Sequence, residues 1–135
     1  MTKLNSYLSL IRFYNPIGFW LLLWPGLWGL FLSDNFNIEN FTIVVLGSFL
    51  TRSLGCAIND FLDKDFDKSV ERTKNRPIAS KELSLSEAGI FIILLASFCI
   101  FLLMQTNPYT IKLVSYIAIP MIILYPLMKR FLAMP

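Results

Sequence analysis

Residues 41–67, FTIVVLGSFLTRSLGCAINDFLDKDFD, decide the fold because they join an apolar segment to a dense run of acids. Residues 41–58 contain one charged side chain, Arg52, whereas four of the next nine residues are aspartates. A helix that crosses a bilayer needs about 20 mostly apolar residues. This stretch therefore predicts a membrane span that runs directly into a charged surface.

The composition of the whole chain agrees with this reading. Of the 135 residues, 56% are hydrophobic and 16% are charged, and the mean hydropathy is +0.61. Soluble domains are roughly 45–50% apolar and about 25% charged. The apolar content excludes a disordered chain, and two cysteines exclude a disulfide scaffold. The net charge is +3, and the basic residues cluster between apolar segments, as in loops on the cytoplasmic side of a membrane. Nucleic acid is therefore not an expected partner.

Three more apolar windows are long enough to span a membrane, at residues 13–33, 88–104 and 109–128. We therefore expect an all-α, multi-pass transmembrane bundle of about four helices in a single domain, residues 1–135. A helical, Asp-rich connection joins the second and third spans. Ser84 followed by Glu87 predicts a capping box at the start of the third span.

The Lys and Arg residues predict the orientation, because cytoplasmic loops collect them. Residues 34–40 and 105–108 contain none, whereas the tail before the first span and the end after the fourth each have two. The connection at residues 59–87 has six: Lys64, Lys68, Arg72, Lys74, Arg76 and Lys81. This alternation predicts that both termini and the Asp-rich connection are cytoplasmic.

The acids of that connection have the spacing of a helix face. If the second helix continues past Ile58, Asn59, Asp63 and Asp67 stand at i, i+4 and i+8, and Asp60 joins the same face. Like charges at this spacing repel, and a divalent cation would offset that repulsion. An oxygen-only row without His or Cys suits Mg²⁺ carrying a phosphate group. Without a metal, the same row is an ordinary solvated helix face.

Basic residues flank the row. Arg52 lies seven residues before Asn59, inside the second span, where an ionisable side chain is costly and marks a functional candidate. Arg72 and Arg76 follow the acids. Carboxylates flanked by guanidinium groups suit a multiply charged phosphate ester with its metal ions.

These residues resemble a known motif. The first aspartate motif of the UbiA superfamily of intramembrane aromatic prenyltransferases is similar to the string Arg52-x-x-Gly55-x-x-x-Asn59-Asp60-x-x-Asp63-x-x-x-Asp67 with Arg72-Thr73-x-Asn75-Arg76-Pro77. The first span resembles that of the 4-hydroxybenzoate polyprenyltransferase branch. The residues that carry this resemblance are Arg12, Asn15-Pro16-Ile17-Gly18 and Leu23-Trp24-Pro25-Gly26-Leu27-Trp28. The family's tyrosine-lysine motif is resembled by Tyr125-Pro126-x-x-Lys129.

The resemblance implies a fold of nine helices, about twice this length, with a second aspartate motif in the later half. On that basis we expect this chain to be the amino-terminal half of such an enzyme and to be inactive alone. In one respect the chain departs from the branch, which usually carries an acidic and a basic residue before Pro-Ile-Gly. This chain has Tyr14 and Asn15 there, which leaves the aromatic acceptor open.

The activity implied is Mg²⁺-dependent transfer of a polyprenyl group from its diphosphate to an aromatic acid. The implied acceptor is 4-hydroxybenzoate, in ubiquinone biosynthesis at a bacterial inner membrane. The implied Mg²⁺ and catalytic residues are Asn59, Asp60, Asp63 and Asp67. The implied substrate-binding residues are Arg12, Asn15, Arg52, Arg72, Arg76, Tyr125 and Lys129. Arg72, Tyr125 and Lys129 would contact diphosphate, and Arg12 and Arg52 either orient the acids or hold the aromatic carboxylate.

Three alternatives stay open. Another UbiA-type enzyme could use a different aromatic or quinone precursor. A CDP-alcohol phosphatidyltransferase also uses aspartates at helical spacing, but its pattern has Gly after an early Asp and an Ala-Arg pair beyond, which do not follow Asp60 or Asp63. A cation transporter fragment would place acids at membrane depth, whereas here arginines that repel a cation follow the acids.

Overall fold

The computed structural model describes residues 2–34, 36–121 and 124, and every regular element in them is a helix, as predicted. The elements, in chain order, are α1 (Lys3–Leu10), α2 (Ile17–Leu32), α3 (Ile38–Leu62), α4 (Lys64–Asp67), α5 (Leu85–Met104), α6 (Pro108–Leu113) and the π-helical turn η1 (Val114–Ala118).

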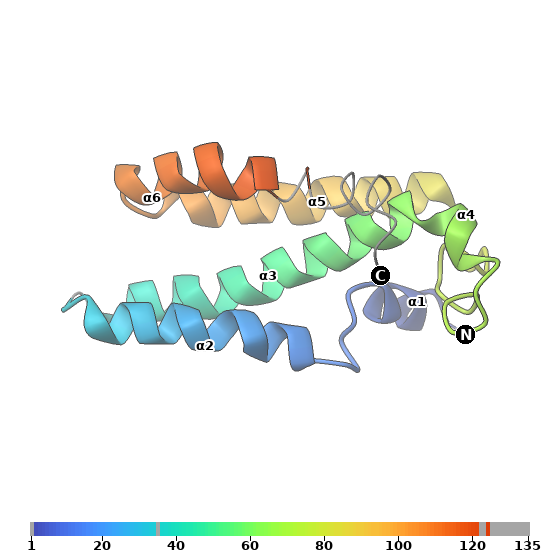
Figure 1. Cartoon of the computed structure of the whole chain (residues 1–135), viewed down its shortest axis with the longest axis horizontal. Coiled ribbons are helices and arrows are strands. Elements are labelled where there is room, and N and C mark those ends of the chain that lie inside the picture. The colour runs from blue at the N-terminus through green and yellow to red at the C-terminus, as the bar shows by residue number, and fades with distance from the viewer. Residues whose placement is uncertain (1, 35, 122–123, 125–135) are drawn as a thin grey trace.

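Helix α3 is the centre of the molecule, and it packs against α2 on one side and α5 on the other. These helices run along the long axis, with α6 beside α5 (Figure 1). The turns that join α2 to α3 and α5 to α6 lie at one end, and α1 and α4 lie at the other. We call the latter end, with α1, α4 and the connection 68–84, the charged end. The basic and non-basic connections thus lie at opposite ends of the bundle.

Among the described residues, two helices, α3 with 25 residues and α5 with 20, are long and apolar enough to cross a membrane. Helix α2 is apolar but has only 16 residues. It begins later than the predicted residue 13 because the chain turns at Arg12 and Pro16 occupies the N-cap. The predicted fourth span begins with α6 and η1, and most of its later part lies outside the described residues.

A buried apolar cluster lies under the charged end. It joins Leu10 of α1, Ala57 of α3, Ile78 and Leu83 of the connection, and Ala88 of α5. Leu10 and Ala57 are fully buried. Because burial of such side chains is the main favourable term in folding, this cluster anchors the connection against the ends of three helices. The charged side chains above it are placed by that packing.

Helix α1 is an element that the sequence reading missed. Its apolar residues Leu4, Tyr7 and Leu8 have the spacing of one helix face, and this signal could have revealed it. Ser6 Oγ donates a hydrogen bond to Glu82 Oε2 at 2.7 Å, and Lys3 forms an ion pair with Glu87. These contacts tie α1 to the start of α5.

The predicted capping box of α5 is confirmed. The Glu87 amide donates to Ser84 Oγ at 3.2 Å, and the Ser84 amide donates to Glu87 Oε2 at 2.9 Å. Two amides at the helix start thereby gain partners that the helix itself cannot supply.

Candidate functional site at the charged end

Helix α3 continues past Ile58 as predicted, and it ends at Leu62. The predicted acidic row is not one unbroken helix, because Asp63 caps α3 with φ −90° and ψ 6° and the short helix α4 follows. The Asp63 amide closes the last turn of α3 by donating to the Asn59 carbonyl at 2.9 Å. Asp60 is therefore within α3, Asp63 is at its end, and Asp67 is the last residue of α4.

Asp60 is buried at the charged end, with 1% of its surface exposed. Arg12 Nη2 donates to Asp60 Oδ1 at 2.8 Å and to Oδ2 at 3.0 Å. Arg76 Nη1 lies 3.1 Å from Asp60 Oδ1. Both carboxylate oxygens of Asp60 therefore have a guanidinium partner. Charge-assisted hydrogen bonds of this kind are roughly twice as strong as neutral ones.

Arg76 also reaches a second acid. Its Nη1 donates to Asp67 Oδ2 at 2.7 Å, and the Asp67 side chain is almost completely buried. Thr73 Oγ1 donates to the backbone carbonyl of Asp67 at 3.2 Å. Arg12, Asp60, Arg76 and Asp67, here called the arginine-aspartate network, have two positive and two negative charges. A buried carboxylate is costly unless it is paired and hydrogen-bonded, and the network meets that requirement.

The backbone of Arg12 is unusual. Its φ of 59° lies in the left-handed region, which non-glycine residues seldom adopt. The Arg12 amide donates to the Ser9 carbonyl at 3.0 Å in the turn that follows α1. The contact with Asp60 holds the side chain of this strained residue against α3.

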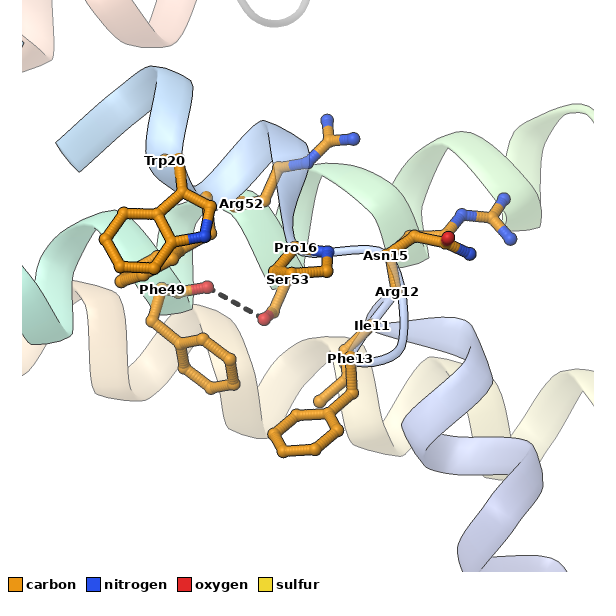
Figure 2. A pocket seen from close by; sticks show the side chains of 10 residues that line it. Ile11, Arg12, Phe13, Asn15, Pro16, Trp20, Phe49, Arg52 and Ser53 are labelled. Atoms are coloured by element: carbon orange, nitrogen blue, oxygen red, sulfur yellow. Dashed lines mark hydrogen bonds between the residues drawn. The ribbon is translucent and has the colours of Figure 1, made fainter. Parts of the chain in front are cut away.

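An apolar cavity of about 360 Å³ lies next to the network, between the α1–α2 turn, α2 and α3. Its wall contains the rings of Phe13, Phe19, Trp20 and Phe49. Figure 2 shows the rings of Phe13 and Phe49 on one side of the cavity, with the Arg52 guanidinium pointing away from them. The cavity thus combines aromatic walls with a cation at its edge.

Arg52 of α3 is half-buried, and its Nε is buried without a hydrogen-bond partner. No ion pair of Arg52 occurs among the described residues. It lies against Gly18 of α2, where an added Cβ would stand 2.1 Å from Arg52 Nε. The absence of a side chain at Gly18 therefore makes room for Arg52. Sequence reasoning missed this role of Gly18, and it missed the cavity wall, because both depend on how α2 packs on α3.

The other predicted site residues are placed as follows. Asn15 is exposed and lines the space beside Arg52, while Arg72 is exposed on the connection. Asn59 and Asp63 are half-buried. Asp65 is exposed, and the Lys68 ammonium group, 2.9 Å away, lowers the pKa of its carboxyl. Tyr125 and Lys129 lie outside the described residues.

The predicted metal ligands offer only carboxylate and amide oxygens, which are the ligand atoms that Mg²⁺ prefers. These residues are Asn59, Asp60, Asp63 and Asp67. Within residues 2–34, 36–121 and 124, no three of the His, Cys, Asp and Glu side chains gather as a cage for a metal ion. Mg²⁺ usually takes one or two carboxylates together with substrate phosphates, and dedicated protein cages are unusual for it. The residues thus fit a magnesium ion that arrives with a phosphorylated substrate.

Comparison with known proteins agrees with this chemistry. Three relatives are each named 4-hydroxybenzoate octaprenyltransferase. The protein of Polynucleobacter asymbioticus is 44% identical over 98% of this chain and 47% of its own length, and that of Polynucleobacter necessarius is 47% identical over 96% and 46%. The protein of Vesicomyosocius okutanii is 48% identical over 93% and 46%.

The chain therefore spans about half the length of these curated relatives. No solved structure matches it. The UbiA prenyltransferase family matches residues 22–135, which is most of the chain and includes α3, the acids and the connection. The chain belongs to the UbiA prenyltransferase family.

Proposed function

We propose that this chain takes part in the magnesium-dependent transfer of a polyprenyl group from polyprenyl diphosphate to an aromatic acid. The acceptor we propose is 4-hydroxybenzoate, which the names of the relatives contain. One observation carries the proposal: acids and guanidinium groups gather at the end of α3 beside an apolar, aromatic-walled cavity. The acids and guanidinium groups suit the diphosphate head of one substrate, and the aromatic-walled cavity suits the ring of the other.

The charged end is the proposed diphosphate site. When the allylic carbon–oxygen bond breaks, negative charge grows on the diphosphate oxygens, and fixed positive charges stabilise it. Arg72 is exposed on the connection and is the described guanidinium that we assign to direct contact with the leaving group. Asn59, Asp63 and Asp67 would hold Mg²⁺, which supplies further charge stabilisation when bound. Asp60 is left out of this set because both of its oxygens contact guanidinium groups.

The cavity beside Arg52 is the proposed acceptor site. The sequence left two roles open for Arg12 and Arg52, and the contacts favour a division between them. Arg12 already binds Asp60, whereas Arg52 has a buried Nε without a partner. We therefore assign the aromatic carboxylate to Arg52, a bidentate match of guanidinium and carboxylate. The aromatic walls would exclude water, which would otherwise quench an allylic cation.

The orientation is part of the proposal. We assign the charged end to the cytoplasmic side of a bacterial inner membrane, because the basic residues of the connection and Arg12 of the α1–α2 turn lie there. The long apolar helices α3 and α5 would cross the bilayer. The diphosphate head would then bind at the inner surface while its isoprenoid tail stays in lipid.

Binding of geranyl diphosphate to the purified chain in lipid nanodiscs tests the proposal. We expect saturable binding in the presence of Mg²⁺ that inorganic diphosphate competes away and inorganic phosphate does not. Vesicles that contain the chain should show no magnesium flux. Flux without affinity for diphosphate would replace the proposal with a cation transporter.

A further inference from the structure

We propose that Asp60 is a positioning residue, the buried counter-ion that holds Arg12 and Arg76 in place, and that it is not a magnesium ligand. The inference rests on the proposed function, because it divides the acids of the diphosphate site into two groups. Asp60 belongs to the fold of the site, and Asp63 belongs to its ligands. Spacing alone places both acids on the same helix face.

The first argument is the state of the Asp60 carboxylate. It is 1% exposed, Arg12 bonds to both oxygens, and Arg76 approaches one of them. A metal ion would have to displace at least one guanidinium group from a buried position. The displaced arginine would then lose a charge-assisted partner in a site where unpaired charges are costly.

The second argument is where the partners of Asp60 come from. Arg12 lies in the turn between α1 and α2, and Arg76 lies in the connection between α4 and α5. They are 48 and 16 residues from Asp60 in sequence. One buried carboxylate of α3 therefore fixes two separate segments. Arg76 extends this link to Asp67 through its 2.7 Å contact, so the position of Asp67 also depends on Asp60.

Asp63 differs in exposure and in position. It is half-buried, and it caps the end of α3. A partly exposed carboxylate at a helix end can accept a metal ion at a lower desolvation cost than a buried carboxylate whose two oxygens are paired. Asp60→Asn and Asp63→Asn are therefore matched substitutions with different expected effects.

Two measurements on the full chain in nanodiscs separate the roles. The first is the rate of tryptic cleavage within the connection without any ligand. The connection contains Lys68, Arg72, Lys74 and Lys81 as cleavage sites, and Arg76 is protected by the Pro77 that follows it. The second is the Mg²⁺ concentration that gives half-maximal binding of geranyl diphosphate. Neither substitution changes the number of cleavage sites.

We expect Asp60→Asn to raise the cleavage rate about tenfold, because release of Arg76 increases the population of the open connection. Its affinity for geranyl diphosphate at saturating Mg²⁺ should fall, and the Mg²⁺ midpoint should rise less than in Asp63→Asn, because the ligand position of Asp67 is disturbed but no ligand is removed. Asp63→Asn should raise cleavage by a smaller factor than Asp60→Asn and raise the Mg²⁺ midpoint at least about tenfold, as expected for a lost ligand. A Mg²⁺ midpoint raised as far by Asp60→Asn as by Asp63→Asn, or unaltered cleavage in the Asp60→Asn variant, would overturn the inference.

Arg12→Lys is a second test of the inference, which remains available if the Asp60→Asn variant does not fold. It keeps the charge and loses the two-oxygen contact, so cleavage should rise by a smaller factor, and an unchanged rate would also overturn the inference. If the wild-type chain binds no geranyl diphosphate, the proposed function fails. The cleavage comparison still decides whether Asp60 holds the connection.

Discussion

The arginines of the charged end have carboxylate partners, whereas the arginine at the edge of the neighbouring cavity has none among the described residues. In the arginine-aspartate network, Arg12 and Arg76 each meet a buried carboxylate of the chain itself. At the edge of the cavity, Arg52 points its guanidinium away from the rings of Phe13 and Phe49 (Figure 2), and its buried Nε has no hydrogen-bond partner. Asp60, whose two oxygens are both paired, stabilises the fold, whereas Arg52, whose Nε has no partner, is available for a ligand. Substitutions in the two regions should therefore affect different properties.

The largest effect is expected from Arg76→Ala. This substitution leaves Asp67 without its guanidinium partner and removes one of the two partners of Asp60. Removal of one member of a buried ion pair costs about 3–5 kcal/mol, and thermal unfolding in detergent should show a loss of that size. Arg72→Ala is the matched control, because Arg72 is exposed on the same connection. Equal losses in the two variants would mean that the network contributes nothing.

Arg52→Gln should have the opposite profile. We expect the unfolding midpoint to stay close to that of the wild type, because no described carboxylate loses a partner. Affinity for 4-hydroxybenzoate should fall by about 1.5–3 kcal/mol, which is typical of a hydrogen bond to a charged group. Calorimetry can measure this. Binding of the uncharged 4-hydroxybenzamide should hardly change, and an equal loss for both compounds would argue against a carboxylate contact.

Gly18→Ala tests the same contact between Arg52 and the acceptor carboxylate without removing a charge. The new Cβ would overlap Arg52 Nε, so the flexible Arg52 side chain must move. We expect affinity for 4-hydroxybenzoate to fall by about threefold to tenfold, with stability retained, since Ala favours helix. Gly47→Ala in α3 is the control, because a Cβ there meets nothing within 4 Å. Identical affinities in these two variants would separate Arg52 from the acceptor.

The smallest effect is expected from Asp65→Asn, which removes an acid of the same run outside the network. The pKa of Asp65 is lowered by Lys68, so the pair stabilises the fold at neutral pH and this contribution is lost as the pH falls through that pKa. Because the pair is exposed and screened, unfolding curves of the variant and wild type should superimpose at pH 7 and at pH 5. A clear difference would extend the network to the outer face of α4.

Local features of the fold could be predicted from the sequence. The apolar windows gave α3 and α5, and Ser84 and Glu87 gave the start of α5. The continuation of α3 past Ile58 followed from the helical spacing of the acids, although the helix ends at Leu62 and does not reach Asp67. These features depend on residues within a few turns of one another, where periodicity and capping operate.

The partners of the acids could not be predicted in the same way. The row suggested three carboxylate ligands helped by Asn59, but Asp60 contacts Arg12 across 48 residues of sequence. Such a pairing depends on how α1, α3 and the connection pack over one core, and no local pattern encodes it. The close approach of α2 at Gly18 has the same origin.

The coupling between magnesium and the diphosphate tests the central claim most directly. The affinity of the chain for geranyl diphosphate would be measured by calorimetry with and without Mg²⁺, and the affinity for Mg²⁺ with and without geranyl diphosphate. Because binding free energies are reciprocal, both comparisons must give the same factor. We predict a factor above about tenfold, as expected for an ion held by one or two carboxylates and the substrate's phosphates. Equal affinities with and without the partner ligand would contradict the account.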